Sequence, residues 1–234
     1  MRILGLDTSS HINAVGLISD DHVLGDFAWE AKNSSLQRIV SAIDFVLGSA
    51  RLRIEDVDGF AVGIGPGSWT GVRIGLTVGK MLALSCNKPV CGVSSLDALA
   101  SYGRNFSGGI CPIVDAGRGM IYAALYRSRS GVVKRKGEYH TGSITGLLEK
   151  VQGRTLFLGD AAHSHHDNIV AALGKKAIFR SRAEDVLRGS AIASLAAGRL
   201  NNGESDDALA LTPLYLRESA AQALLERKSQ KGEA

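Results

Sequence analysis

The residues best suited to bind a ligand form a glycine-rich segment in the first third of the chain. Residues 63–75 read GIGPGSWTGVRIG, follow a predicted strand and open a predicted helix. Backbone N–H groups at the start of such a helix can hold an anion. The segment is neither a Walker loop, since Lys80 is not followed by Ser or Thr, nor a Rossmann fingerprint, since Pro66 interrupts it. One interpretation is therefore a phosphate-binding loop of another kind.

The spacing of the glycines supports a different interpretation. Gly67, Gly71, Gly75 and Gly79 recur every four residues, and the last three lie inside the predicted helix. Each glycine there costs about 1 kcal/mol of helix stability relative to alanine. A helix that carries such a stripe usually lets a second backbone approach closely. The spacing favours a packing or partner-binding face over a ligand loop.

A cluster of histidines and aspartates resembles a metal site in composition. His163, His165 and His166 lie close to Asp160 and Asp167 in sequence, and histidine is a common zinc ligand. No cysteine or second histidine pair lies nearby, so we predict a solvated loop or helix start and no metal. There is also no Gly-x-Ser-x-Gly elbow, and no histidine can be assigned to a serine or cysteine. We predict no catalytic residue.

The elements that must position these residues alternate between strands and helices. Apolar runs predict strands at 2–6, 14–18, 23–29, 58–64 and 89–93, and helical spacing predicts helices at 34–47, 70–84 and 94–100. Ser34 and Gln37 fit a capping box at the start of the first helix. The order βββαβαβα is that of one domain of the actin and sugar-kinase superfamily, a mixed sheet with helices on both faces.

The second half of the chain shows a sparser version of the same pattern. A stretch rich in Gly, Ser and Asn at 102–109 predicts the boundary. Beyond it we expect strands at 110–114, 121–126 and 156–158 and helices at 168–173 and 189–200. The predicted fold is α/β: an actin-like (ribonuclease H-like) two-lobe fold with an N-terminal lobe at 1–103 and a reduced second lobe with a C-terminal tail at 104–234.

Two aspartates occupy corresponding places in the two predicted lobes. Asp7 ends the first strand of the first half, and Asp115 ends the first strand after the boundary. In the actin-like superfamily such a pair faces the interlobe cleft and handles the metal and phosphates of a nucleotide. The alternative is that each carboxylate caps its own turn, because the residues after Asp7, Thr-Ser-Ser-His, include no glycine. Asp7 and Asp115 are the candidate cofactor-binding residues, although we expect no tightly bound cofactor.

Composition limits the functional classes and the compartment. The 27 lysines and arginines outnumber the 23 acids by four, and the excess is spread along the chain except at 134–136 and in the tail. Spread charge is weak evidence for nucleic-acid binding. Three cysteines indicate a reducing compartment. With no signal peptide and no apolar run approaching the roughly 20 residues of a membrane helix, we predict a cytoplasmic protein without membrane contact.

Several segments together resemble the bacterial TsaB family. They are residues 3–9, 62–75, 92–96, 115–122 and 213–217, and the match is specific over the first hundred residues. The resemblance implies a non-catalytic partner of the paralogous transferase TsaD. With TsaE and ATP, that assembly transfers a threonylcarbamoyl group from its adenylate to the adenosine beside the anticodon, in tRNAs that read codons beginning with adenine. TsaD holds a metal between two histidines of a helix, and the corresponding helix here, 34–47, contains none.

The resemblance also implies where the partners bind. In TsaB relatives the first two helices form a bundle with the same helices of TsaD, or of a second copy in a homodimer, and tRNA is reached through the complex. The predicted partner-binding residues are Leu36, Ile39, Val40, Ile43, Trp69, Gly71, Val72, Arg73, Gly75, Leu76 and Gly79. Two alternatives remain: a magnesium-dependent ATP-binding or ATP-hydrolysing protein that uses Asp7 and Asp115, and direct tRNA binding through the basic residues.

Overall fold

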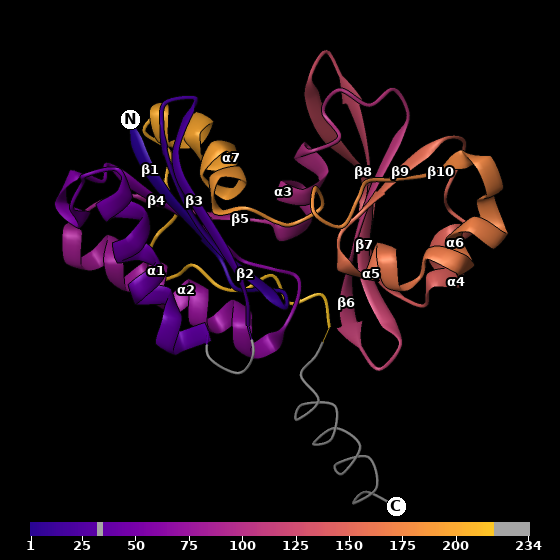
Figure 1. Ribbon diagram of the computed structural model, residues 1–234, viewed down its shortest axis with the longest axis horizontal. Helices are drawn as coiled ribbons and strands as arrows, with labels where there is room; N and C mark the ends of the chain where they lie inside the picture. The colour runs from indigo at the N-terminus through magenta and orange to yellow at the C-terminus, as the bar shows by residue number, and fades with distance from the viewer. Residues whose placement is uncertain (32–34, 218–234) are drawn as a thin grey trace, which may run out of the picture.

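The computed structural model describes residues 1–31 and 35–217, without the side chains of Ser35 and Leu36 (Figure 1). The predicted cap at Ser34, the partner-binding side chain of Leu36 and the tail from Ser219 therefore lie outside the described part. The first lobe contains β1 (Arg2–Asp7), β2 (Ile12–Ser19), β3 (His22–Glu30), α1 (Ser35–Ser49), β4 (Gly59–Gly63), α2 (Trp69–Cys86), β5 (Val90–Val93) and α3 (Ser95–Ser101). The second contains β6 (Gly109–Gly117), β7 (Met120–Arg129), β8 (Val132–Gly142), α4 (Ile144–Leu148), β9 (Thr155–Leu158), α5 (Asp160–Ser164), α6 (His166–Leu173) and β10 (Ala177–Phe179), before α7 (Gly189–Asn201).

The two lobes are built on sheets of the same topology. The first has the order β3-β2-β1-β4-β5 and the second the order β8-β7-β6-β9-β10. In both, the first two pairings are antiparallel and the last two are parallel. The predicted two-lobe α/β fold is confirmed. The second sheet has as many strands as the first, so its reduction is confined to the helices: α4 and α5 have five residues, against 15 in α1 and 18 in α2.

The glycine stripe of α2 packs against the chain's own first lobe. Added Cβ atoms on Gly71 and Gly75 would lie 2.0 Å from the Thr8 carbonyl oxygen and 2.5 Å from Thr8 Oγ1, and one on Gly79 would lie 2.2 Å from a Val62 methyl group. All three glycines are buried. Their predicted place on a partner-binding surface is therefore corrected. The stripe lets α2 approach β4 and the turn after β1, as the packing interpretation requires.

A second set of glycines brings the C-terminal half back to the first lobe. Helix α7 lies on the face of the first sheet opposite α1 and α2 (Figure 1). An added Cβ on Gly5 would lie 2.2 Å from the Gly189 carbonyl oxygen, and one on Gly16 would lie 2.1 Å from the Ser190 amide nitrogen. The predicted second domain, 104–234, is corrected accordingly: α7 covers the first sheet, because that sheet needs a helix on each face.

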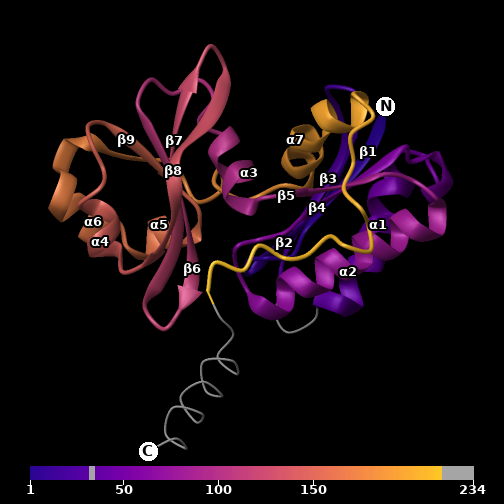
Figure 2. The ribbon, with the colours of Figure 1, turned by 180° about the vertical axis from the view of Figure 1, so that it is seen from behind.

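The segment after α7 continues along the first lobe and crosses α2 (Figure 2). Lys80 Nζ donates to the carbonyl oxygens of Leu209 (3.0 Å) and Leu211 (2.9 Å). The Trp69 ring stacks on Tyr215 with centroids 4.0 Å apart, and Arg73 Nε donates to Tyr215 Oη at 2.9 Å. Trp69 and Arg73, predicted as partner contacts, thus hold the chain's own C-terminal segment.

Helix α3 forms the joint between the lobes. Its buried residues Leu96 and Leu99 belong to one hydrophobic cluster with Tyr126 of the second sheet and Ile192 of α7. The Tyr126 hydroxyl donates to Asp97 of α3 at 2.6 Å. Among the described helices, none is long and apolar enough to cross a membrane.

Candidate functional site

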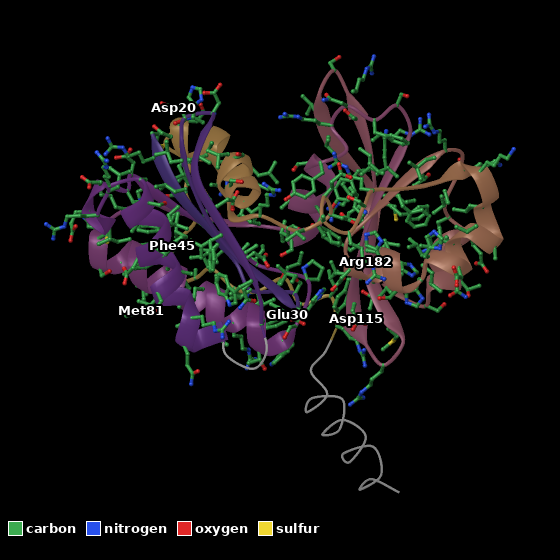
Figure 3. All side chains as sticks on the ribbon, viewed as in Figure 1. Asp20, Glu30, Phe45, Met81, Asp115 and Arg182 are labelled. Atoms are coloured by element: carbon green, nitrogen blue, oxygen red, sulfur yellow. The ribbon has the colours of Figure 1, made fainter. Side chains whose placement is uncertain are left out.

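A cavity of about 180 Å³ lies between the lobes. Its first-lobe wall is the turn between β1 and β2 together with α3, and its second-lobe wall is formed mainly by α5 and the irregular segment that follows β10. Figure 3 places Arg182, one of the lining residues, on the side of the second lobe that faces the first. The lining residues are Ser9, Ser10, His11, Ile12, Ser95, Leu99, Val114, Gly159, Asp160, His163, Ser164, Arg182, Asp185, Val186 and Leu187.

Asp7 lies behind this cavity and does not line it. One carboxylate oxygen accepts from the Ser9 amide (2.8 Å) and hydroxyl (2.7 Å), and the other accepts from the Ser95 hydroxyl (2.6 Å). Burial raises the pKa of Asp7, and the bonds from Ser95 and Ser9 offset part of that rise. An added Cβ on Gly63 would lie 1.9 Å from Asp7 Oδ2, so the carboxylate has no free space on that side. Asp7 therefore fixes the turn and α3 relative to each other.

Asp115 is exposed and does not line the cavity either. Its Oδ1 accepts from the Gly117 amide at 2.9 Å, which is the turn-capping bond of the alternative interpretation, and Asp7 makes the same bond to Ser9. The Asp115 amide donates to Asp160 Oδ1 at 3.3 Å. The structure thus does not bring the two predicted cofactor-binding carboxylates together at this cavity.

The groups that do face the cavity are histidines paired with aspartates. His11 Nδ1 lies 3.1 Å from Asp160 Oδ2 and links the first lobe to α5. His163 Nε2 lies 3.0 Å from Asp185 Oδ2, which also accepts from the Gly159 amide. Burial raises the pKa of Asp185 to about 7 and lowers the pKa of His163. Asp185 Oδ1 is buried without a hydrogen-bond partner in the structure, so the pair holds one unused acceptor at the cavity wall.

The sequence indicated part of this site under a different interpretation. Asp160 and His163 belong to the predicted metal-like cluster, but the other three members, His165, His166 and Asp167, do not line the cavity, and His166 contacts Phe179 and Asp167. No group of three or more metal-ligating side chains occurs in the described ranges. Arg182 and Asp185 were missed because they lie in an irregular segment without a motif, and only tertiary contacts bring them to the cavity.

Most of the predicted partner-binding side chains are buried. Ile39, Ile43, Val72 and Leu76 are no more than 5% exposed and pack in the first lobe, so their predicted surface role is corrected. Val40 is exposed, at 57%. Helical spacing identified the apolar face of α1, which is the face that turns toward the sheet.

Other apolar side chains do lie on the outer face of these helices. Phe45 of α1 is 61% exposed, and Met81 and Leu84 of α2 are 60% and 47% exposed. Figure 3 shows Phe45 and Met81 on the same side of the first lobe, away from the second. We call Val40, Phe45, Met81 and Leu84 the α1–α2 surface.

Comparisons with known proteins agree with this architecture. The family model for TsaD, tRNA N6-adenosine threonylcarbamoyltransferase, matches residues 29–224. The tRNA threonylcarbamoyladenosine biosynthesis protein TsaB of Bacillus subtilis (strain 168) is 34% identical over 226 residues, 95% of this chain and 97% of the relative. A crystal structure from Pseudomonas aeruginosa, of an uncharacterized protein with similarity to peptidase YeaZ, has a TM-score of 0.77 at 24% identity, covering 92% of this chain and 99% of that chain.

The duplicated sheets joined through α3 place the protein in the actin-like class of two-lobe α/β proteins. The ROK hexokinase of Thermus thermophilus shares this fold, with a TM-score of 0.50 at 12% identity over 87% of this chain and 100% of that chain. Within the class, similarity to the Bacillus subtilis protein along nearly the whole length of both chains is decisive. The chain belongs to the TsaB family of tRNA threonylcarbamoyladenosine biosynthesis proteins.

Proposed function

We propose that the protein is a non-catalytic subunit in the biosynthesis of threonylcarbamoyladenosine in tRNA, and that it acts by binding TsaD. The family relationship carries this proposal. The assembly would also include TsaE and use ATP, and would transfer the threonylcarbamoyl group from its adenylate to the adenosine beside the anticodon of tRNAs that read codons beginning with adenine. A cytoplasmic location follows as part of the same proposal.

The contacts of the polar residues support a non-catalytic role. Ser9 and Ser95, two of the serines that line the cavity, both donate to Asp7. A serine nucleophile requires a base within hydrogen-bond reach; the base that both hydroxyls reach is the buried Asp7 carboxylate, which they share, and in the described structure neither hydroxyl is bonded to a histidine. The buried cysteines do not supply a nucleophile, because burial raises the pKa of Cys91 and Cys111 and the thiolate is the reactive form.

The α1–α2 surface is our candidate for the TsaD-binding face. It presents three aliphatic or thioether side chains and one aromatic ring on two adjacent helices. Exposed apolar side chains on neighbouring elements are candidate interaction sites, and the Phe45 ring also packs on the exposed Phe27 ring of β3, with centroids 5.3 Å apart. When TsaD is absent, the same surface would pair with a second copy of the chain, which accounts for the homodimer expected from the family resemblance.

The test is co-purification with TsaD from the same organism. We expect the double variant Val40→Glu with Met81→Glu to lose TsaD and to become monomeric, while its thermal unfolding stays cooperative. The matched control is Val132→Glu with Val170→Glu, two exposed apolar residues of the second lobe, which should retain TsaD. Wild-type recovery of TsaD by the first variant would refute the assignment of this face.

The alternative of an ATP-hydrolysing protein predicts that Asp7 and Asp115 act on magnesium. The contacts of Asp7 argue against it, since both oxygens of that buried carboxylate are occupied by Ser9 and Ser95. Calorimetry of the isolated chain with magnesium and ATP tests the alternative directly. Micromolar binding that is lost in Asp115→Ala would support the ATPase and count against a purely structural subunit.

A further inference from the structure

Five basic residues within one ten-residue stretch of the sequence lie on a two-stranded ribbon of the second lobe. The ribbon is the end of the β7–β8 hairpin, residues 127–136, and it projects from the second sheet across from α7 (Figures 1 and 2). It carries the exposed side chains of Arg127, Arg129, Lys134, Arg135 and Lys136. In the part of the chain that the structure describes, none of these five side chains forms an ion pair with a carboxylate. The ribbon is thus a local concentration of positive charge.

The pairing of the strands places like charges against each other. Arg127 lies directly opposite Lys134, whereas Arg135 lies opposite Tyr126 on the other face of the ribbon. Like charges directly opposite in an antiparallel pair destabilise it. Edge strands often carry lysines to prevent aggregation, and this accounts for Lys134 and Lys136 on the edge strand β8. It does not account for Arg127, which lies between Gly109 of β6 and Lys134 of β8.

A groove on the Arg135 face of the ribbon carries further arginines. Its volume is about 1300 Å³, and it lies between the β7–β8 hairpin, α3 and α7. Arg104, Arg135 and Arg180 line it, together with Arg199, which is paired with Asp206 at 2.6 Å. The one carboxylate among its lining residues, Asp97, already accepts a hydrogen bond from the Tyr126 hydroxyl. Cations therefore outnumber the single carboxylate in this groove, and Arg135 lies over the Tyr139 ring at 3.8 Å.

We propose that the ribbon binds the phosphate backbone of RNA. Alternate residues on a strand are about 7 Å apart, so Arg127 with Arg129, and Lys134 with Lys136, present regularly spaced cations. A repeating anion suits such an array better than a protein surface does, because protein interfaces have an apolar core, and Val132 is the exposed large apolar side chain at the ribbon tip. The proposal rests on the proposed function, in which tRNA is the substrate of the assembly.

The two proposed surfaces lie on different lobes, so TsaD and RNA can be bound together. The α1–α2 surface covers the outer side of the first lobe, and the ribbon belongs to the second (Figure 1). A variant of one surface should therefore leave the other intact, which separates the two proposals experimentally.

The test measures binding of a fluorescein-labelled, unmodified tRNA transcript that reads a codon beginning with adenine. Fluorescence anisotropy is recorded over a salt series, with the full chain alone and in complex with TsaD. In both preparations we expect Arg127→Gln with Lys134→Gln to bind at least tenfold more weakly at low salt. The slope of log affinity against log salt should become shallower by about two, as for the loss of two phosphate contacts.

Two controls decide the outcome. Lys175→Gln with Lys176→Gln removes the same charge from exposed residues next to β10, at the opposite edge of the sheet, and should bind within twofold of wild type. The ribbon variant should still co-purify with TsaD and melt no lower than wild type, because a like-charge pair has been removed. Wild-type affinity of the ribbon variant in both preparations would overturn the proposal. So would an equal loss in the control, or a loss of binding to polyglutamate without a loss of binding to tRNA, which would indicate an acidic protein partner.

Discussion

At the scale of single residues, glycines and one carboxylate determine how closely the elements pack. Gly71, Gly75 and Gly79 bring α2 against β4 and the β1–β2 turn, and Asp7 ties that turn to α3 through Ser9 and Ser95. Spacing alone indicated that the glycine stripe is a packing face. It did not show which backbone fills the stripe, because that depends on contacts between residues far apart in the chain.

Substitution of a stripe glycine should destabilise the fold instead of only blocking a partner. Gly71→Ala places a methyl group against the Thr8 carbonyl oxygen, and we expect a loss of at least about 2 kcal/mol, since overpacking outweighs the gain in helix propensity. Gly198→Ala is the matched control: it lies inside α7 with nothing within 4 Å of the added Cβ and should stabilise by about 0.5–1 kcal/mol. Urea unfolding measures both, and equal effects would refute the packing role.

The raised pKa of Asp185 predicts a pH dependence of stability. Its folded pKa is about 7, against about 3.9 in an unfolded chain. The folded state therefore retains the proton longer than the unfolded state, and the stabilising contribution present below pH 4 is lost as the pH rises through 7. Relative to Asp185→Asn, whose side-chain oxygen can still accept from Gly159, the free energy of unfolding of wild type should fall between pH 4 and pH 7. If the free energies of unfolding of the two proteins change with pH in parallel, the raised pKa is not that of Asp185.

At the scale of elements, the first half could be predicted and much of the second could not. Buried strands such as β1 and β4 are continuous apolar runs, so their predicted bounds differ from the observed ones by a residue or so. Strand β8 was missed because most of its residues are exposed, several are charged, and the strand lacks an alternation of apolar and polar residues. Arg127 and Lys134 become neighbours only in the folded ribbon.

The C-terminal segment is an element without regular secondary structure that α2 holds by specific contacts. Trp69 stacks on Tyr215, and such aromatic pairs contribute about 0.5–1.5 kcal/mol beyond their buried area. A double-mutant cycle with Trp69→Ala and Tyr215→Ala should give a coupling energy in that range. The same cycle with Tyr139→Ala, in the other lobe, should give about zero. A coupling near zero for the first pair would show that the segment is not held by this stack.

At the scale of the whole molecule, the order of the elements along the chain does not match their division between the two lobes. The two sheets follow each other in sequence, but α7 returns from the second half to cover the first sheet. The boundary near residue 103 was read from composition, which marks where one sheet ends and cannot show where a later helix docks. Gly5 and Gly16 indicate where α7 docks, because two glycines in adjacent buried strands allow the backbone of another element to approach closely.

The docking of α7 predicts which fragments fold. Residues 1–103 alone expose the sheet face that α7 covers, so we expect no cooperative thermal transition and rapid hydrogen exchange of the β1 and β2 amides. A chimera that joins 1–103 to 189–217 through a Gly/Ser linker should restore both, although below wild-type stability, because α3 loses its contacts with Tyr126. The same chimera with Ile192→Glu, a fully buried α7 position, should fail like the short fragment, since an unpaired buried charge is strongly destabilising. Cooperative folding of 1–103 by itself would show that the first lobe is complete without α7 and that the domain boundary predicted from composition is also the boundary of stability.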